Sequence, residues 1–151
     1  MLRDYEFQGE YSVFSDQLYS DFLEPCIQNS IIYRRASGYF SSTIFALGPM
    51  AFTEFFENGG RVQLICSPHF SSDDQNAIQN ANEAADMSLA EVWSNSVKAA
   101  TASEFGNLTS RFLAALIRND YLDLKIARFT AGNGLFHDKL GIFSDENGEV
   151  L

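Results

Sequence analysis

The chain has 151 residues, of which 46% are hydrophobic, and its aromatic residues are 14 Phe, 6 Tyr and 1 Trp. This length fits one domain, and the apolar content excludes a disordered chain because it is sufficient for a packed core. The formal net charge of −10 argues against a domain coated for nucleic-acid binding, since phosphate contacts require Lys and Arg. A local basic cleft is still compatible with this charge.

The sequence carries no targeting or cofactor signal. No apolar run has the length of a membrane span, and residues 1–5 lack the pattern of a signal peptide, so we expect a cytoplasmic location and no membrane partner. Cys26 and Cys66 are too few for a disulfide framework, and no Cys/His spacing is typical of a zinc site. We expect both cysteines to be reduced and buried, and we expect no metal and no other cofactor.

The first predicted elements are a helical region and a strand. Residues 1–30 carry apolar side chains at helical spacing up to Pro25, which predicts an N-terminal helical extension. Residues 31–40 are typical of a strand. Ser41 and Ser42 follow it as possible helix N-caps.

Helices dominate the middle of the chain. Residues 43–58 have helical character, interrupted by a Gly-Pro pair that predicts a new helix start. A short apolar strand is predicted over residues 61–66. Two capping boxes, at residues 88–91 and 101–104, divide residues 73–119 into three predicted helices.

The last third of the chain returns to strands. Residues 121–129 and 135–143 predict two strands on either side of a Gly-Asn-Gly turn, and residues 145–148 are a hairpin signal. The order of elements predicts an α/β layered domain with a mixed β-sheet flanked by helices, in which helices join the parallel pairs. Residues 1–151 contain no repeat and no clear domain boundary, which predicts a single domain.

The end of the chain suggests a fragment. A hairpin is normally followed by a return strand of about five residues, but only residues 149–151 follow this one. We therefore expect the domain to be truncated within the hairpin, with its C-terminal part missing. A short native edge strand is the alternative.

The segment before the hairpin carries the most distinctive polar pair. Because strand side chains alternate, we expect His137 and Lys139 to point to one face, and Leu140 and Ile142 to point to the other, into a core. An imidazole and an ammonium side by side are suited to an anionic group. One can act as nucleophile or acid/base, and the other can hold a phosphate oxygen.

Residues 136–145 resemble the His-x-Lys signature of the phospholipase D superfamily. More narrowly, they are similar to the diverged version in domains attached to bacterial DEAD/DEAH-type helicases and restriction-like proteins. Residues 37–42 and 58–66 also resemble that subgroup, so the resemblance runs from about residue 30 to the end. It implies a phospholipase D-like fold and metal-independent cleavage of a phosphodiester through a phosphohistidine, with His137 as nucleophile or acid and Lys139 as phosphate clamp.

The chain departs from the family pattern in three ways. The position of the family's aspartate is Ser144, with Asp145 one residue later, and the usual Gly-Ser-x-Asn segment is absent. Only one copy of the motif is present, whereas the implied chemistry needs two histidines. His69 has no lysine two residues on and is no second copy. We therefore expect a homodimer partner or a missing part of the protein to supply the second histidine.

Four further residues are candidates for substrate binding. Arg34 lies on a predicted strand, Ser41 and Ser42 stand at a predicted helix N-terminus, which is an anion site by construction, and Asp145 follows the motif. The alternatives are a surface salt bridge for Arg34 and plain helix capping for the two serines.

The resemblance implies a phosphodiesterase or nuclease that acts on nucleic acid, with DNA as the expected substrate. It further implies the N-terminal module of a helicase or restriction-type (defence) protein, with a helicase domain downstream in the same chain. We expect weak or no activity from the isolated chain. The alternative is a catalytically inactive nucleic-acid-binding or dimerisation module of the same fold.

Overall fold

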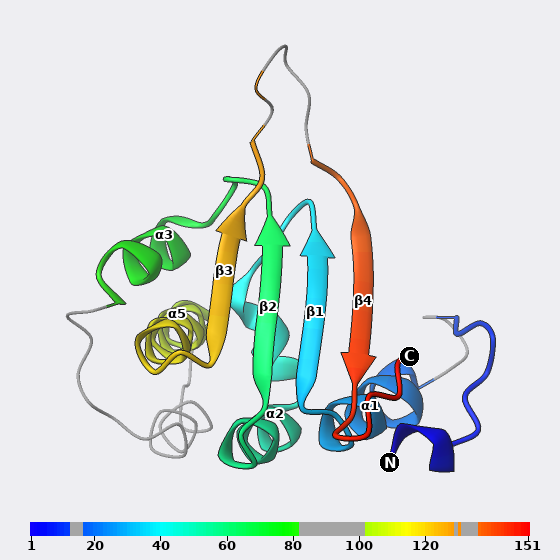
Figure 1. The fold of residues 1–151 in the computed structure, drawn as a ribbon. Helices are drawn as coiled ribbons and strands as arrows, with labels where there is room; N and C mark the ends of the chain where they lie inside the picture. The colour runs from blue at the N-terminus through cyan, green and yellow to red at the C-terminus, as the bar shows by residue number, and fades with distance from the viewer. Residues whose placement is uncertain (13–16, 82–101, 129, 131–135) are drawn as a thin grey trace.

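The structure, a computed structural model, describes residues 1–12, 17–81, 102–128, 130 and 136–151. It contains one four-stranded sheet in the order β3-β2-β1-β4 (Figure 1). The strands are β1 (Ile32–Ser37), β2 (Arg61–Cys66), β3 (Leu122–Ile126) and β4 (Lys139–Ser144). β1, β2 and β3 are mutually parallel, and β4 pairs antiparallel with β1. The prediction of an α/β domain with a mixed sheet is confirmed.

Helices connect the parallel strands, as expected for right-handed crossovers onto one sheet. The helical segments are η1 (Leu2–Asp4), η2 (Tyr19–Leu23), α1 (Glu24–Gln28), η3 (Ser42–Leu47), α2 (Pro49–Glu57), α3 (Ser72–Gln79) and α5 (Ala102–Arg118). The Gly-Pro break divides the predicted helix over residues 43–58 into η3 and α2. The capping box at residues 88–91, the first residue of the box at residues 101–104 and the Gly-Asn-Gly turn lie outside the described residues.

A core rich in phenylalanine lies between one face of the sheet and the helices. In Figure 1, η3 and α2 pass behind β1 and β2. Phe52 and Phe56 of α2 and Phe112 of α5 are at most 1% exposed. Each such ring contributes about 1.5–3 kcal/mol through its burial. The core therefore fixes the helices on this face and holds the ends of the strands in place.

The prediction that Leu140 and Ile142 face the core is wrong. β4 has apolar side chains at both parities, and Phe143 is the one that enters the core, where its ring stacks on Tyr33 with centroids 4.3 Å apart. Leu140 is 59% exposed. The sheet face that bears Leu140 and Ile142 is not covered by any described residue, and it has a hollow of about 250 Å³ whose lining also includes Arg34.

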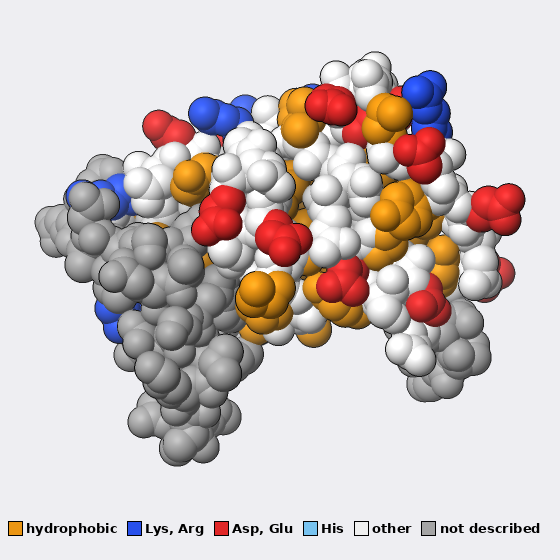
Figure 2. Space-filling model, turned by 90° about the horizontal axis from the view of Figure 1, so that it is seen from below, with side chains coloured by type: hydrophobic (Ala, Val, Ile, Leu, Met, Phe, Trp, Pro, Cys, Tyr) orange, Lys and Arg blue, Asp and Glu red, His pale blue; other side chains and the backbone are white. Residues whose placement is uncertain are grey.

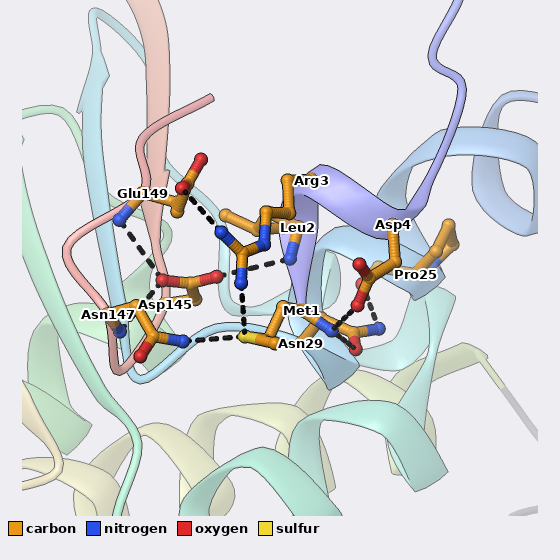
Figure 3. A network of polar contacts seen from close by, with 9 residues as sticks. All are labelled: Met1, Leu2, Arg3, Asp4, Pro25, Asn29, Asp145, Asn147 and Glu149. Carbon is orange, nitrogen blue, oxygen red and sulfur yellow. Dashed lines mark hydrogen bonds and ion pairs between the residues drawn. The ribbon is translucent and has the colours of Figure 1, made fainter.

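The predicted hairpin is present, and the N-terminus packs against it. Ser144 forms an isolated antiparallel bridge with Val150, and Phe143 and Leu151 exchange two backbone hydrogen bonds. Figure 3 shows the first residues of the chain beside this turn. None of the helices that the structure describes combines the length and the hydropathy needed to cross a bilayer.

Candidate functional site

The three parallel strands end at the upper edge of the sheet in Figure 1, and polar and aromatic side chains meet at this edge. Tyr39 follows the end of β1 by two residues, and His69 follows the end of β2 by three. β4 runs antiparallel and starts at the same edge, so His137 lies there too, two residues before Lys139. The carboxyl edge of parallel strands is where open α/β sheets bind ligands.

The two histidines of the chain both contact the ring of Tyr39. The centroid of the Tyr39 ring is 5.5 Å from that of His137, in an edge-to-face arrangement, and 6.0 Å from that of His69. All three residues are exposed, and Tyr39 exposes 55% of its surface. A ligand can therefore reach both imidazoles and the aromatic ring from solvent.

The backbone around His137 is anchored to the ends of β1 and β2. The Gly38 N–H donates to the carbonyl of Asp138 at 2.9 Å, which continues the β1–β4 ladder past its last strand pair. In this register His137 stands opposite Tyr39. The Ser67 hydroxyl donates to the carbonyl of Phe136 at 2.7 Å. His137 therefore precedes β4 but is held as if it were part of the strand.

Lys139 is the first residue of β4 and pairs with Ser37, the last residue of β1. It is exposed, and the register gives it the same face as His137. The Ser37 hydroxyl donates to the carbonyl of Tyr39 at 2.6 Å, which fixes the backbone below the tyrosine ring. An ammonium group thus lies on the strand that leads out of the histidine site.

A hollow of about 260 Å³ adjoins Tyr39. Its lining residues are Arg35, the hydroxyl-bearing Ser37, Ser41 and Thr43, and the apolar Phe40, Ile44 and Leu47. Arg35 donates to the Tyr33 hydroxyl at 2.7 Å, and its Nε has no hydrogen-bond partner among the described residues. The hollow offers a cation and hydroxyl groups beside an aromatic ring.

The other residues predicted to bind substrate do not all lie at the edge of the sheet that carries the histidines. Ser41 is an exposed N-cap of η3, where it accepts from the Thr43 N–H, and it also lines the hollow. Ser42 is 1% exposed, and its hydroxyl donates to Thr109. Arg34 lies on the other face of the sheet and donates to the Ser144 hydroxyl at 3.2 Å. The structure therefore brings Ser41 to the sheet edge where His69 and His137 lie. It does not bring the side chains of Arg34 or Ser42 there.

Asp145 lies at the opposite end of β4 from His137, in the corner that Figure 3 shows. Its carboxylate accepts backbone N–H bonds from Leu2, Asn147 and Glu149 at 2.9–3.2 Å. Burial alone would raise the pKa of this carboxyl, but the three donors and the N-terminal charge outweigh it and lower the pKa. Asp145 therefore organises the turn and is not part of the histidine edge.

The two cysteines are buried thiols, as predicted. Burial raises the pKa of Cys26 to about 12 and that of Cys66 to about 11. Although Cys66 ends β2 close to the candidate site, its thiol stays protonated at neutral pH and is a poor nucleophile. The described residues contain no group of three or more His, Cys, Asp or Glu side chains that could hold a metal ion.

Sequence reasoning missed Tyr39 and gave His69 no place in the site. The signal that could have found both is positional, because each follows directly on a predicted parallel strand, and such positions meet at one edge of the sheet. A scan against protein-family models found no family that matches the chain, and searches of curated proteins and of solved structures found no match.

Proposed function

We propose that the chain is a phospholipase D-like phosphodiesterase domain that acts on nucleic acid. The observation that carries the proposal is the meeting of both imidazoles at the carboxyl edge of the sheet, around Tyr39 and beside Lys139. The proposal also rests on the resemblance of residues 136–145 to the His-x-Lys signature.

The reaction needs a nucleophile, an acid and a cation. A ring nitrogen of His137 attacks phosphorus and forms a phosphohistidine, while the bond to the leaving oxygen breaks and an acid supplies that oxygen with a proton. Water then attacks the phosphohistidine, which releases a phosphomonoester and restores the imidazole. The ammonium of Lys139 stabilises the negative charge that develops on the phosphate oxygens.

Nucleic acid is the substrate that fits the surroundings of the site. An exposed aromatic ring offers a stacking surface for a base, and such stacking contributes about 1–3 kcal/mol per base. The end of the molecule away from the site carries Asp and Glu side chains scattered among apolar ones (Figure 2). Since backbone phosphates avoid such a surface, we propose that this domain grips only the nucleotides next to the scissile bond. The rest of the grip would come from downstream parts of a helicase or restriction-type protein.

Metal-independent cleavage tests the proposal. The 151-residue chain is incubated with single- and double-stranded DNA in EDTA. If the gene encodes a longer protein, that protein is tested in the same way. We expect cleavage that disappears in His137→Ala and that falls by about 10²–10³ in kcat in Lys139→Ala, the usual effect of removing a charge-stabilising donor. Cleavage that persists undiminished in His137→Ala would contradict the proposal.

The second candidate is a nucleic-acid-binding module without turnover. The observation that favours it is the lack of an orienting partner, since neither imidazole has a hydrogen bond to a carboxylate among the described residues. Catalytic imidazoles are normally oriented by such a group. In this case DNA would bind with an affinity that falls in Lys139→Ala, and no cleavage would occur at any protein concentration.

A further inference from the structure

We infer that His69 is the second imidazole of the proposed phosphodiesterase site, so that one chain carries the whole catalytic pair. This inference rests on the proposed function and deepens it. It replaces the expectation that a partner subunit or a missing segment supplies the second histidine. It assigns a role to a residue that lies outside the His-x-Lys motif, 68 positions before His137.

An in-line reaction sets a requirement on the spacing of the two imidazoles. Attack places the nucleophilic nitrogen about 3 Å from phosphorus, and the acid stands about 3 Å from the leaving oxygen on the far side. The two nitrogens are then roughly 7 Å apart with the diester between them. The ring centroids of His137 and His69 lie 5.5 and 6.0 Å from that of Tyr39, so the two imidazoles are separated by no more than the sum of these distances.

The structure also couples the two histidine segments to each other. The hydroxyl of Ser67, two residues before His69, donates to the carbonyl of Phe136, next to His137. Ser67 is 1% exposed and Phe136 is half-buried, so the bond is partly shielded from water. The loop after β2 and the segment before β4 therefore move together, and the separation of the imidazoles is set within one chain.

Tyr39 is the positioning residue of the pair. Its ring is a common wall against which both imidazoles pack, and the bond from Ser37 to its carbonyl holds its backbone. Both histidines remain exposed on their other sides. A diester that enters from solvent can thus reach both imidazoles beside the tyrosine ring.

The register assigns a different step to each histidine. His137 shares its face with Lys139, so it attacks the phosphorus whose oxygens the ammonium holds. His69 donates a proton to the leaving oxygen when the phosphohistidine forms. It then takes a proton from the water that hydrolyses this intermediate, and the pair returns to its starting protonation state.

A comparison of leaving groups tests this division of roles. The full chain is given a DNA oligonucleotide, whose leaving alkoxide needs a proton, and thymidine 5′-(p-nitrophenyl) phosphate, whose leaving p-nitrophenolate does not. In His69→Ala, oligonucleotide cleavage should fall by about 10²–10⁴, the usual contribution of a general acid. The same variant should release one p-nitrophenolate per chain in a burst. It should then stall as a phosphoenzyme that intact mass spectrometry detects, because hydrolysis lacks its base.

The controls separate this inference from the proposed function. His69→Gln repeats the test in case the alanine variant unfolds, and Glu57→Ala, on the exposed side of α2, should match the wild type on both substrates. If His137→Ala is inactive but His69→Ala and His69→Gln equal the wild type, the inference is overturned and the proposed function stands. The inference is also overturned if the His69 variants lose activity on both substrates and release no burst of p-nitrophenolate. If the wild-type chain and the longer protein are inactive on both substrates, the inference and the proposed function are both overturned.

Discussion

Gly38 is where the backbone of β1 comes closest to the histidine segment. A Cβ at this position would stand 2.7 Å from both the Cα of His137 and the carbonyl oxygen of Phe136. Both are backbone-linked atoms, so neither can swing away as the end of a flexible side chain could. Only glycine allows β1 and the segment that carries His137 to lie this close.

We expect Gly38→Ala to push the His137 segment away from β1. The free energy of unfolding should fall by about 1–3 kcal/mol, the usual effect of overpacking, and cleavage should fall with it because the two imidazoles lose their spacing. Urea unfolding and the DNA assay measure the two effects. Gly9→Ala is the matched control, since a Cβ at Gly9 has no neighbour within 4 Å. Equal stability and activity of the two variants would show that the close approach has no consequence.

The buried cysteines give a second prediction at the residue scale. With pKa values of about 12 for Cys26 and about 11 for Cys66, both stay protonated well above the ordinary cysteine pKa. Because the thiolate is the reactive form, a disulfide reagent at about pH 8 should label neither residue at an appreciable rate in the folded chain. Both should react at once in denaturant. Fast labelling without denaturant, with a rate that rises through about pH 8.5, would contradict the burial of these thiols.

At the scale of elements, Asp74 connects three helical segments. It lies in the first turn of α3, is 1% exposed, and accepts hydrogen bonds from the Ser42 N–H at 3.0 Å and from the Ser110 hydroxyl at 2.8 Å. Ser42 begins η3, and Ser110 belongs to α5. The carboxylate therefore ties η3, which follows Tyr39, to α3 and α5, which both lie between β2 and β3 in the chain.

We expect Asp74→Ala to lower the free energy of unfolding by roughly 2–4 kcal/mol, because it leaves a buried N–H and a buried hydroxyl without their acceptor. Asp73→Ala removes the same charge one residue earlier, from an exposed position, and should change stability by less than about 0.5 kcal/mol. Thermal and urea unfolding of both variants measure the difference. If the two variants are equally stable, the buried network contributes nothing beyond helix charge.

Elements could be predicted from the sequence where local signals decide them. The strand at Arg61–Cys66 is a short apolar run that follows a Gly-Gly stop, and the prediction of its existence is confirmed. For β4, apolar residues stand at both parities, so the prediction chose the wrong face, and the packing of Phe143 on Tyr33 determines the right one. That contact joins residues far apart in sequence, which no local pattern encodes.

The candidate site could be predicted only in part, for the same reason. His137 and Lys139 are two residues apart in one extended segment that leads into β4, so the alternation of side chains was enough to place them on one face. His69 and Tyr39 reach them only because β1 and β2 are adjacent and parallel, with β4 on the free side of β1. The order of strands in the sheet is a property of the whole fold, and the site depends on it.

For the whole molecule, the N-terminus meets the hairpin at the base of β4. The Asp145 carboxylate accepts from the Leu2 N–H and from the backbone of the hairpin itself, and Arg3 lies 3.7 Å from Glu149 (Figure 3). These contacts link residues separated by nearly the full length of the chain. They tie the N-terminus to the turn that follows β4, which is the strand that carries Lys139.

This corner should make the stability of the domain sensitive to acid. Because hydrogen bonds lower the pKa of Asp145 in the folded chain, its ionised form favours folding at any pH above the ordinary carboxyl pKa of about 3.9. That contribution disappears as the pH falls through the lower pKa of the folded state. We therefore expect Asp145→Asn to be less stable than the wild type from about pH 7 down to about pH 5, and the difference to shrink below about pH 4. Urea unfolding of both proteins across this pH range measures the difference.

Asp4→Asn is the matched control. It removes an exposed carboxylate from the same corner but leaves the three backbone donors to Asp145 in place. A pH-dependent loss in Asp4→Asn as large as that in Asp145→Asn would mean that net charge, and not the turn, holds the two ends of the chain together.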